Sequence, residues 1–376
     1  MTGPDSAGKE KKHGSTAPDY GLVLTVLLLA GFGLVVLYST SSWNGQVKFA
    51  DPAYYLKKQL LATALGLAAM YAVSCIDYHK WGKLAGLGYL ISLLLQVAVL
   101  IFGDEYNGSR RWLAIGPVSF QPSEFAKVAV ILLLARVISS RLQRIVTLRQ
   151  MLGVMLLALP LVGLVGTNNL STAIIIMGIA VILIFVASPG YLRFVLIGAG
   201  GAGFLAVFLS LESYRLERLA IWRHPEAYEK GYQTMQGLYA IGSGGLFGVG
   251  FGGSLQKLGF VPEAQNDMIF SIVCEEFGLM GAVLLMLLFV LLVWRLYSIA
   301  VHVQDLFGCL IVTGILGHIL IQVILNIAVV TNTIPNTGIT LPFVSYGGTS
   351  VLFLLSEMGM ALNVSRNHPH GESGIC

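Results

Sequence analysis

Ten runs of mostly apolar residues recur along the chain, and they constrain its fold more than any other feature. A helix of about 20 residues crosses a hydrocarbon layer about 30 Å thick. Because backbone groups in lipid must hydrogen-bond within their own segment, each run is expected to be helical. The sequence therefore predicts an all-α, polytopic integral membrane protein with about ten transmembrane helices. The runs fall at roughly 20–42, 57–76, 83–102, 119–138, 151–166, 169–188, 191–211, 268–295, 304–330 and 345–364.

The polar content is too low for a soluble protein. Charged residues make up 11% of the chain and hydrophobic residues 56%, whereas a soluble domain carries about 25% charged residues. Lipid must therefore be the main solvent. We expect a single membrane domain over residues 19–365, with a large extracytoplasmic loop at 212–267 between the seventh and eighth helices. Residues 1–18 and 366–376 are expected to form disordered cytoplasmic tails.

The distribution of Lys and Arg predicts the orientation. Loops on the side of the N-terminus carry twelve of these cations, whereas the short loops on the other side carry five. Because cytoplasmic loops are enriched in Lys and Arg, both termini are predicted to lie in the cytoplasm. The first apolar run, from Tyr20, is longer than a signal-peptide core and lacks a clear cleavage site, so we interpret it as a retained helix.

Three polar segments stand out on the predicted outer side, and the first is residues 107–127. Its turn-forming residues predict a loop that leads into the fourth helix. Glu124 and Lys127 are three residues apart and should share one face of that helix. They could form a local ion pair at the interface or a functional pair, and Arg110 and Arg111 could equally be anchors at the headgroup level. The turn-forming residues are Gly108, Pro117 and Pro122.

The second segment is the end of the long loop. Residues 242–253 hold seven glycines, which allow a sharp bend or a close approach to another backbone. Asp267 stands where the eighth helix begins, so it could cap that helix. Its position on the same side as the Arg-bearing and Lys-bearing loops raises a functional alternative. Glu275 and Glu276 follow inside the helix, and adjacent carboxylates there require a polar interior.

The third segment, residues 332–350, contains two prolines and three glycines. These residues prevent a regular helix, so we predict a re-entrant loop. Non-helical backbone at this depth is tolerated only where protein buries it or where it lines a wet cavity. The hydroxyl groups of Ser345 and Tyr346 could line such a cavity, and a packing role is the alternative.

Several catalytic signatures are missing from the sequence. It contains no HExxH, GxSxG or GxxxxGK[ST] pattern and no His/Cys cluster suited to zinc. These absences argue against zinc hydrolysis, a serine triad and ATP-driven transport within this chain. We therefore predict no metal site.

Taken together, the three segments resemble the SEDS family of membrane glycosyltransferases, which is typified by FtsW, RodA and SpoVE. The matching stretches are residues 107–127, 231–278 and 336–350, and the resemblance extends from about Tyr20 to Arg366. Residues 253–267 look closer to the FtsW and SpoVE members than to RodA. The resemblance therefore points to septum or spore-cortex synthesis.

The resemblance implies a function, a location and a partner. Members of the family polymerise lipid II, an undecaprenyl-diphosphate disaccharide-pentapeptide, at the outer face of the bacterial cytoplasmic membrane. They act with a class B penicillin-binding protein, a transpeptidase, and not with nucleic acid. The family's catalytic Asp corresponds to Asp267, and its cavity charges correspond to Glu124 and Lys127. This chain has Gln265 and Asn266 where many members have His and Thr, but the Asp itself is kept.

The residue types agree with this chemistry. A sugar hydroxyl attacks C1 of the donor, and a diphosphate leaves without needing a proton. One carboxylate as general base is then sufficient, while cations hold the diphosphate. We expect Asp267 to be the base and Glu124 to orient Lys127; a divalent cation could assist, but no cofactor is required. The predicted substrate-binding residues are Lys127, Glu124, Arg111, Arg110, Lys257, Glu263, Ser345 and Tyr346.

Two other functions stay open at this stage. A lipid II transporter would also need many helices and intramembrane charges, although its functional charges should lie near the midplane. A non-enzymatic scaffold that recruits the transpeptidase would tolerate loss of the Asp267 carboxylate.

Overall fold

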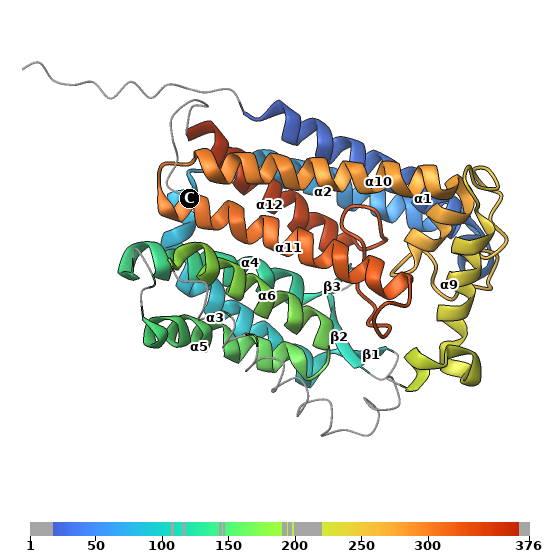
Figure 1. The fold of residues 1–376 in the computed structure, drawn as a ribbon, viewed down its shortest axis with the longest axis horizontal. Coiled ribbons are helices and arrows are strands. Elements are labelled where there is room, and N and C mark those ends of the chain that lie inside the picture. The colour runs from blue at the N-terminus through green and yellow to red at the C-terminus, as the bar shows by residue number, and fades with distance from the viewer. Residues whose placement is uncertain are drawn as a thin grey trace, which may run out of the picture.

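The computed structural model describes residues 18–106, 109–115, 118–142, 145, 147–189, 194, 198 and 220–367. Its helices run roughly along the long axis of the molecule (Figure 1). Seven of the described helices are long and apolar enough to cross a membrane, which agrees with a multi-pass membrane protein. They are α1 (Tyr20–Phe49), α2 (Tyr54–Cys75), α3 (Tyr78–Phe102), α5 (Leu148–Gly166), α6 (Leu170–Ala187), α10 (Ile269–His302) and α11 (Leu306–Val330).

Two further helices fall on predicted apolar runs. Helix α4 (Pro122–Val137) is short, and α12 (Gly348–Asn367) carries several polar residues. The predicted helix at 191–211 lies outside the described residues except for Phe194 and Gly198. The number of ten helices therefore stays a prediction.

Helix α11 lies at the centre of the bundle. In Figure 1 it runs between the group α1, α2, α10 and α12 and the group α3, α4, α5 and α6. In its most apolar stretch 72% of the residues are buried, against 22% for α3, whose outer face is available to lipid. Polar side chains on α11 therefore have to find partners inside the protein.

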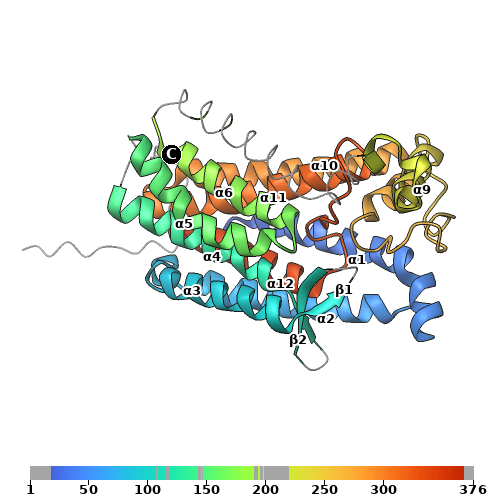
Figure 2. The same ribbon diagram turned by 90° about the horizontal axis from the view of Figure 1, so that it is seen from below.

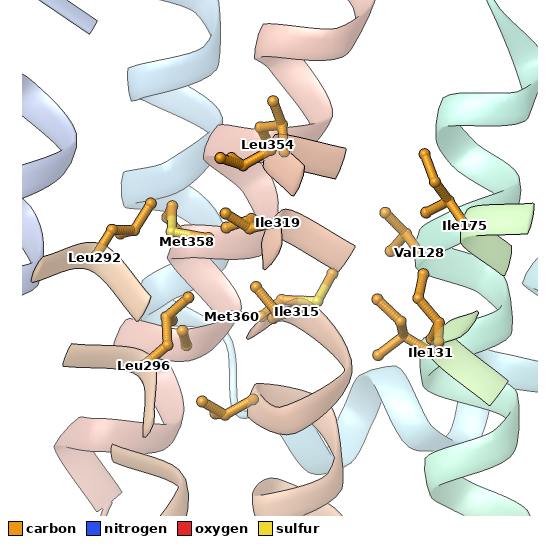
Figure 3. Packing of buried hydrophobic residues seen from close by; sticks show 14 of the residues in the cluster. Val128, Ile131, Ile175, Leu292, Leu296, Ile315, Ile319, Leu354, Met358 and Met360 are labelled. Carbon is orange, nitrogen blue, oxygen red and sulfur yellow. The ribbon is translucent and has the colours of Figure 1, made fainter. Parts of the chain in front are cut away.

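The apolar core fills the space around α11. Figure 3 shows Ile315 and Ile319 of α11 between side chains of α4 and α6 on one side and those of α10 and α12 on the other. Each of these side chains is almost fully buried. Close packing of this kind, rather than water exclusion, holds helices together in lipid. The neighbours in Figure 3 include Val128, Ile131, Ile175, Leu292, Leu296, Leu354 and Met358.

The segment between α3 and α4 differs from the predicted turn-rich loop. It forms a three-stranded antiparallel sheet in the order β1 (Asp104–Tyr106), β2 (Ser109–Ile115), β3 (Val118–Phe120). The sheet contacts α3 and α4 through β2, and α1 and α2 run on past it (Figure 2). An Asn-Gly dipeptide at 107–108 separates the first two strands in the sequence, and this dipeptide is a strong hairpin signal. The predicted turn-rich loop was wrong in this respect, because an Asn-Gly dipeptide favours a hairpin whose flanking residues pair as strands.

The described part of the long loop, from residue 220, contains α9 (Tyr232–Ser243), two short 3-10 helices (Pro225–Ala227 and Glu229–Gly231) and the glycine-rich stretch. This stretch packs into a break in α10, where Gly278 adopts φ 66° and ψ −164°. The amides of Val249 and Gly250 donate to the carbonyl groups of Glu275 and Glu276 at 2.9 and 3.0 Å. A Cβ on Gly248 would lie 2.1 Å from the Glu276 carbonyl oxygen. The predicted close backbone approach is confirmed.

Candidate active site

Asp267 lies just before α10, but it does not cap that helix. The residue at the cap position is Met268, whose side chain makes no capping hydrogen bond. The Asp267 side chain is 9% exposed and accepts a 3.3 Å hydrogen bond from Nε2 of Gln233 on α9. Its main-chain carbonyl accepts a 2.8 Å bond from Nδ2 of Asn326 on α11. Both its side chain and its backbone are thus held in place.

Arg111 of β2 and Asp267 both lie next to Gly338, which belongs to the segment that follows α11. A Cβ on Gly338 would lie 3.9 Å from Nη1 of Arg111 and 3.9 Å from Oδ2 of Asp267. Gly338 has φ +71°, a conformation that favours glycine. Nε of Arg111 also donates to the carbonyl oxygen of Asn168 at 3.0 Å, which orients the guanidinium group. A carboxylate and a guanidinium group thus border one small space.

The pKa of Asp267 is raised from 3.8 to about 6. Burial is the main cause, because a charge is poorly solvated away from water. The nearby carboxylate of Glu263 raises this pKa further, whereas the hydrogen bond from Gln233 and the charge of Arg111 lower it. A carboxylate with a pKa near 6 is ionised at neutral pH and is a stronger base than an ordinary Asp.

Glu124 and Lys127 form a buried ion pair in the first turns of α4. Nζ of Lys127 lies 2.9 Å from Oε1 of Glu124, and the two residues are only 1% and 6% exposed. Nζ also donates to Oε1 of Gln322 on α11 at 3.0 Å. The pair therefore points into the bundle rather than toward the headgroups.

One face of α11 carries three buried polar residues at four-residue spacing, His318, Gln322 and Asn326, which we call the α11 stripe. Gln322 contacts Lys127, and Asn326 contacts the backbone of Asp267. Residues four apart lie about one helical turn, or about 6 Å, from each other along the axis. The α11 stripe thus contacts both the ion pair of α4 and Asp267, the residue just before α10.

Sequence reasoning missed the α11 stripe. The signal was available, since polar residues at i, i+4 and i+8 in a 25-residue apolar helix must share one face. His318 further contacts Glu357 of α12, with Nδ1 at 2.8 Å from Oε2. Both side chains are buried, at 1% and 0% exposure.

Lys257 has partners other than Asp267, Glu124 or Lys127 among the described contacts. Its Nζ is 2.6 Å from Oε1 of Glu276 and donates to Oγ of Ser39 at 2.8 Å. The neighbouring Glu275 accepts from Oγ of Ser254 and from the amide of Leu255. These contacts provide the polar interior that adjacent carboxylates require, and they attach the long loop to α1 and α10.

Three predicted substrate-binding residues remain, namely Ser345, Tyr346 and Arg110. Oγ of Ser345 accepts from the amide of Leu341 at 2.8 Å, which shapes the segment after α11. The amide of Tyr346 donates to the Gln265 carbonyl at 2.9 Å. Nη1 of Arg110, whose side chain is exposed, donates to the carbonyl of Leu100 at 3.4 Å. The structure thus brings Arg111 and Glu263 to Asp267, whereas Ser345, Tyr346 and Arg110 each bind a main-chain group of another residue.

Glu263 acts on Asp267 through its negative charge, which raises the pKa of Asp267. Its Oε2 accepts a 2.8 Å hydrogen bond from Nδ2 of Asn266, the residue before Asp267. Within the part of the chain that the structure describes, no three His, Cys, Asp or Glu side chains gather as a metal site would require.

The chain matches known proteins over almost its whole length. Residues 20–370 match the sequence profile of the FtsW/RodA/SpoVE family, described as "Cell cycle protein". Stage V sporulation protein E of Bacillus subtilis is 41% identical over 360 residues, which cover 93% of this chain and 98% of that protein. A probable peptidoglycan glycosyltransferase FtsW of Trichlorobacter lovleyi is 36% identical and covers 92% of this chain and 93% of its own length.

Solved structures agree with this relationship. A chain of a peptidoglycan synthase complex that coordinates polymerization and crosslinking superposes with a TM-score of 0.79 at 31% identity, over 94% of this chain and 99% of the other. The rod shape determining protein RodA of Thermus thermophilus gives a TM-score of 0.70 at 30% identity, with the same coverage. This chain therefore belongs to the FtsW/RodA/SpoVE, or SEDS, family of membrane proteins and is closer to its FtsW and SpoVE members.

Proposed function

We propose that this chain is a peptidoglycan glycosyltransferase that polymerises lipid II at the outer face of the bacterial cytoplasmic membrane, for the septum or the spore cortex. The relatives named above support this activity, because FtsW proteins of similar length are named as such transferases. The single observation that carries the proposal is that the Asp267 carboxylate and the Arg111 guanidinium group border the same small space beside Gly338.

Asp267 fits the role of general base. The 4-hydroxyl of the acceptor sugar loses its proton to the Asp267 carboxylate while its oxygen attacks C1 of the donor sugar. The C1–O bond to the diphosphate breaks on the opposite face, so the configuration inverts. Because the diphosphate leaves as a stable anion, no second acid is needed. A pKa of about 6 keeps the base ionised at pH 7.

The cations fit the role of diphosphate holders. Arg111 offers a planar pair of N–H donors that matches phosphate oxygens. Lys127 adds a point charge deeper in the bundle, where low dielectric strengthens its attraction for an anion. Charge that builds on the leaving oxygen is then stabilised by groups already in place. A divalent cation would add to this set without being required by it.

The proposal includes a class B penicillin-binding protein as partner and both termini in the cytoplasm. The similarity to a chain of a synthase complex supports the partner. The excess of Lys and Arg in the loops on the side of the N-terminus supports the orientation. In that orientation Asp267, Arg111 and the sheet lie on the side where the glycan strand is built.

The test is polymerisation of lipid II by the purified chain with its cognate transpeptidase, read as a glycan ladder on a gel. A parallel assay follows lipid II movement across liposome membranes. We expect a ladder and no chain-dependent movement. Movement without a ladder would support the transporter. If neither activity is present but the transpeptidase is recruited, the scaffold is supported.

A further inference from the structure

The buried amide of Gln322 has one possible orientation. Its Nε2 lies 3.0 Å from the carbonyl oxygen of Thr340, which can only accept a hydrogen bond. Oε1 of Gln322 therefore points the other way, toward Nζ of Lys127 at 3.0 Å and Nε2 of His318 at 2.9 Å. Since an amide oxygen can only accept, both of these nitrogens must donate to it.

This requirement determines where the protons of His318 lie. Nε2 carries a proton, because it donates to Gln322. Nδ1 faces the carboxyl oxygens of Glu357 at 2.8 and 3.1 Å, so one further proton lies between ring and carboxyl group. Whether this proton is on the ring or on the carboxyl group, the His318–Glu357 pair has no net charge.

The whole cluster is consequently neutral. The Lys127 ammonium balances the Glu124 carboxylate at 2.9 Å, and the His318–Glu357 pair balances itself. Neutrality explains how five polar side chains are tolerated in the middle of a membrane bundle, where an unbalanced charge is costly. The single orientation of the Gln322 amide also gives each hydrogen bond around it a defined direction.

The ammonium group of Lys127 is held but not saturated. It has three N–H donors, and Glu124 and Gln322 take two of them. Among contacts between residues that the structure describes, the third donor is left for another oxygen. Because Lys127 is 1% exposed, its direction is set by the side chains that hold it rather than by water.

We propose that Glu357, His318 and Gln322 act as positioning residues that aim the Lys127 ammonium at the diphosphate of the lipid-linked donor. Glu357 fixes the protonated form of His318, His318 and Thr340 fix the Gln322 amide, and Gln322 holds Nζ of Lys127. This inference rests on the proposed function. The α11 stripe also reaches the Asp267 backbone through Asn326, so one helix sets the spacing between base and cation.

A pair of substitutions at Glu357 tests this inference. Glu357→Gln places an amide N–H where the shared proton was, so the His318 ring keeps its Nε2 proton and the cluster stays neutral. Glu357→Leu removes the partner of Nδ1, so the ring is free to carry its proton on Nδ1 and present a lone pair to Gln322. Only the Leu variant should release Lys127. Once the ammonium group is no longer aimed at the diphosphate, binding should weaken about tenfold, as expected for loss of one hydrogen bond to a charged group.

Asn363 on α12 provides the control. It is buried at 6% exposure and binds the Tyr78 amide and the Ser74 carbonyl, away from the cluster. Asn363→Leu therefore removes a buried polar group from the same helix without touching Lys127. It should lower thermal stability about as much as Glu357→Leu does, and it should leave substrate affinity unchanged.

The experiment measures KM and kcat for lipid II in the complex with the transpeptidase, and Kd for undecaprenyl diphosphate. We expect Glu357→Leu to raise KM and Kd about tenfold with little change in kcat, and Glu357→Gln and Asn363→Leu to resemble the wild type. The inference is overturned if Glu357→Leu changes no more than Asn363→Leu, if Glu357→Gln is as impaired as Glu357→Leu, or if the wild type does not bind the diphosphate. If the wild type binds it and Glu357→Leu weakens that binding, but no ladder forms, the proposed function fails and the positioning role stands.

Discussion

The carboxylate of Asp267 and the guanidinium group of Arg111 both lie beside Gly338, each 3.9 Å from the point that a Cβ would occupy there. The three residues come from the start of α10, from strand β2 and from the segment between α11 and α12. A carboxylate and a guanidinium group thereby border one point, at a position where the backbone carries no side chain.

Gly338→Ala should reduce polymerisation strongly, because the new methyl group would touch both Asp267 and Arg111, 3.9 Å from each. The positive φ of +71° also costs about 1–2 kcal/mol for an L-residue. Gly252→Ala is the matched control, with φ +81° and nothing within 4 Å of its Cβ. Both variants should lose similar thermal stability, but only Gly338→Ala should lose activity. Equal activities would mean that the space beside Gly338 is not used by substrate.

Asp267→Asn should raise thermal stability at pH 7. The pKa of Asp267 rises from 3.8 unfolded to about 6 folded, so the folded state binds the proton more tightly. The stabilisation from that proton is fully present below pH 3.8 and is lost as the pH rises through 6. At pH 7 the buried charge is a cost that Asn removes, whereas at pH 4 the two proteins should melt alike. Melting curves at both pH values check this, and a less stable Asn variant at pH 7 would contradict it.

The pH dependence of kcat/KM should have an acid limb near pH 6. Below that value Asp267 is protonated and cannot accept the proton of the sugar hydroxyl, so the rate falls about tenfold per pH unit. Glu263→Gln removes a negative charge that raises the pKa of Asp267, and it should move the limb to lower pH. Glu229→Gln, at an exposed position of the long loop, should not move it. A limb that stays in place in the Glu263 variant would show that the titrating group is not Asp267.

Lys127→Met should destabilise the protein by about 3–5 kcal/mol, since it leaves the buried Glu124 charge without a partner. The double variant Glu124→Gln/Lys127→Met should regain most of that stability but not the polymerase activity. Lys57→Met is the comparison, because it breaks the ion pair between Lys57 and Asp51 at the surface. The Lys57 side chain is 68% exposed, so the loss should cost less than about 1 kcal/mol of stability. If activity returns in the double variant, the ion pair is only structural.

Lys257→Met should act through stability rather than substrate binding, because Nζ of Lys257 is already paired with Glu276 and Ser39. The double variant Lys257→Met/Glu276→Gln should recover stability and bind lipid II with the wild-type KM. A raised KM in the stable double variant would restore Lys257 to the role of diphosphate holder that the sequence suggested.

The parts of the fold that depend on local pattern were predictable from the sequence. Seven apolar runs became long helices, and the three-residue spacing of Glu124 and Lys127 placed them together. The glycine-rich stretch packs closely on α10, as its composition indicated. The first two features depend on residues that are near one another in the chain, and the third depends on the glycine content of one short stretch.

Contacts between distant residues were not predictable in this way. Nothing near Asp267 in the chain indicates that Arg111 faces it, and nothing near Lys257 indicates that Glu276 binds it. Glu357 is the one acidic residue of α12. Its partner His318 belongs to α11, so the pair forms only because α11 and α12 pack together. Pairing across helices is decided by tertiary packing, which a single sequence does not display.

The most direct test of the account compares Asp267→Asn with the wild type in lipid II polymerisation, each in complex with the same class B transpeptidase and with lipid II at saturating concentration. Asn keeps the size of the side chain and its hydrogen bond with Gln233 but cannot accept the proton of the sugar hydroxyl. We predict a glycan ladder from the wild type and none from a variant that is folded, bound to its partner and able to bind undecaprenyl diphosphate. A ladder of wild-type intensity from that variant would contradict the role of Asp267 as the base.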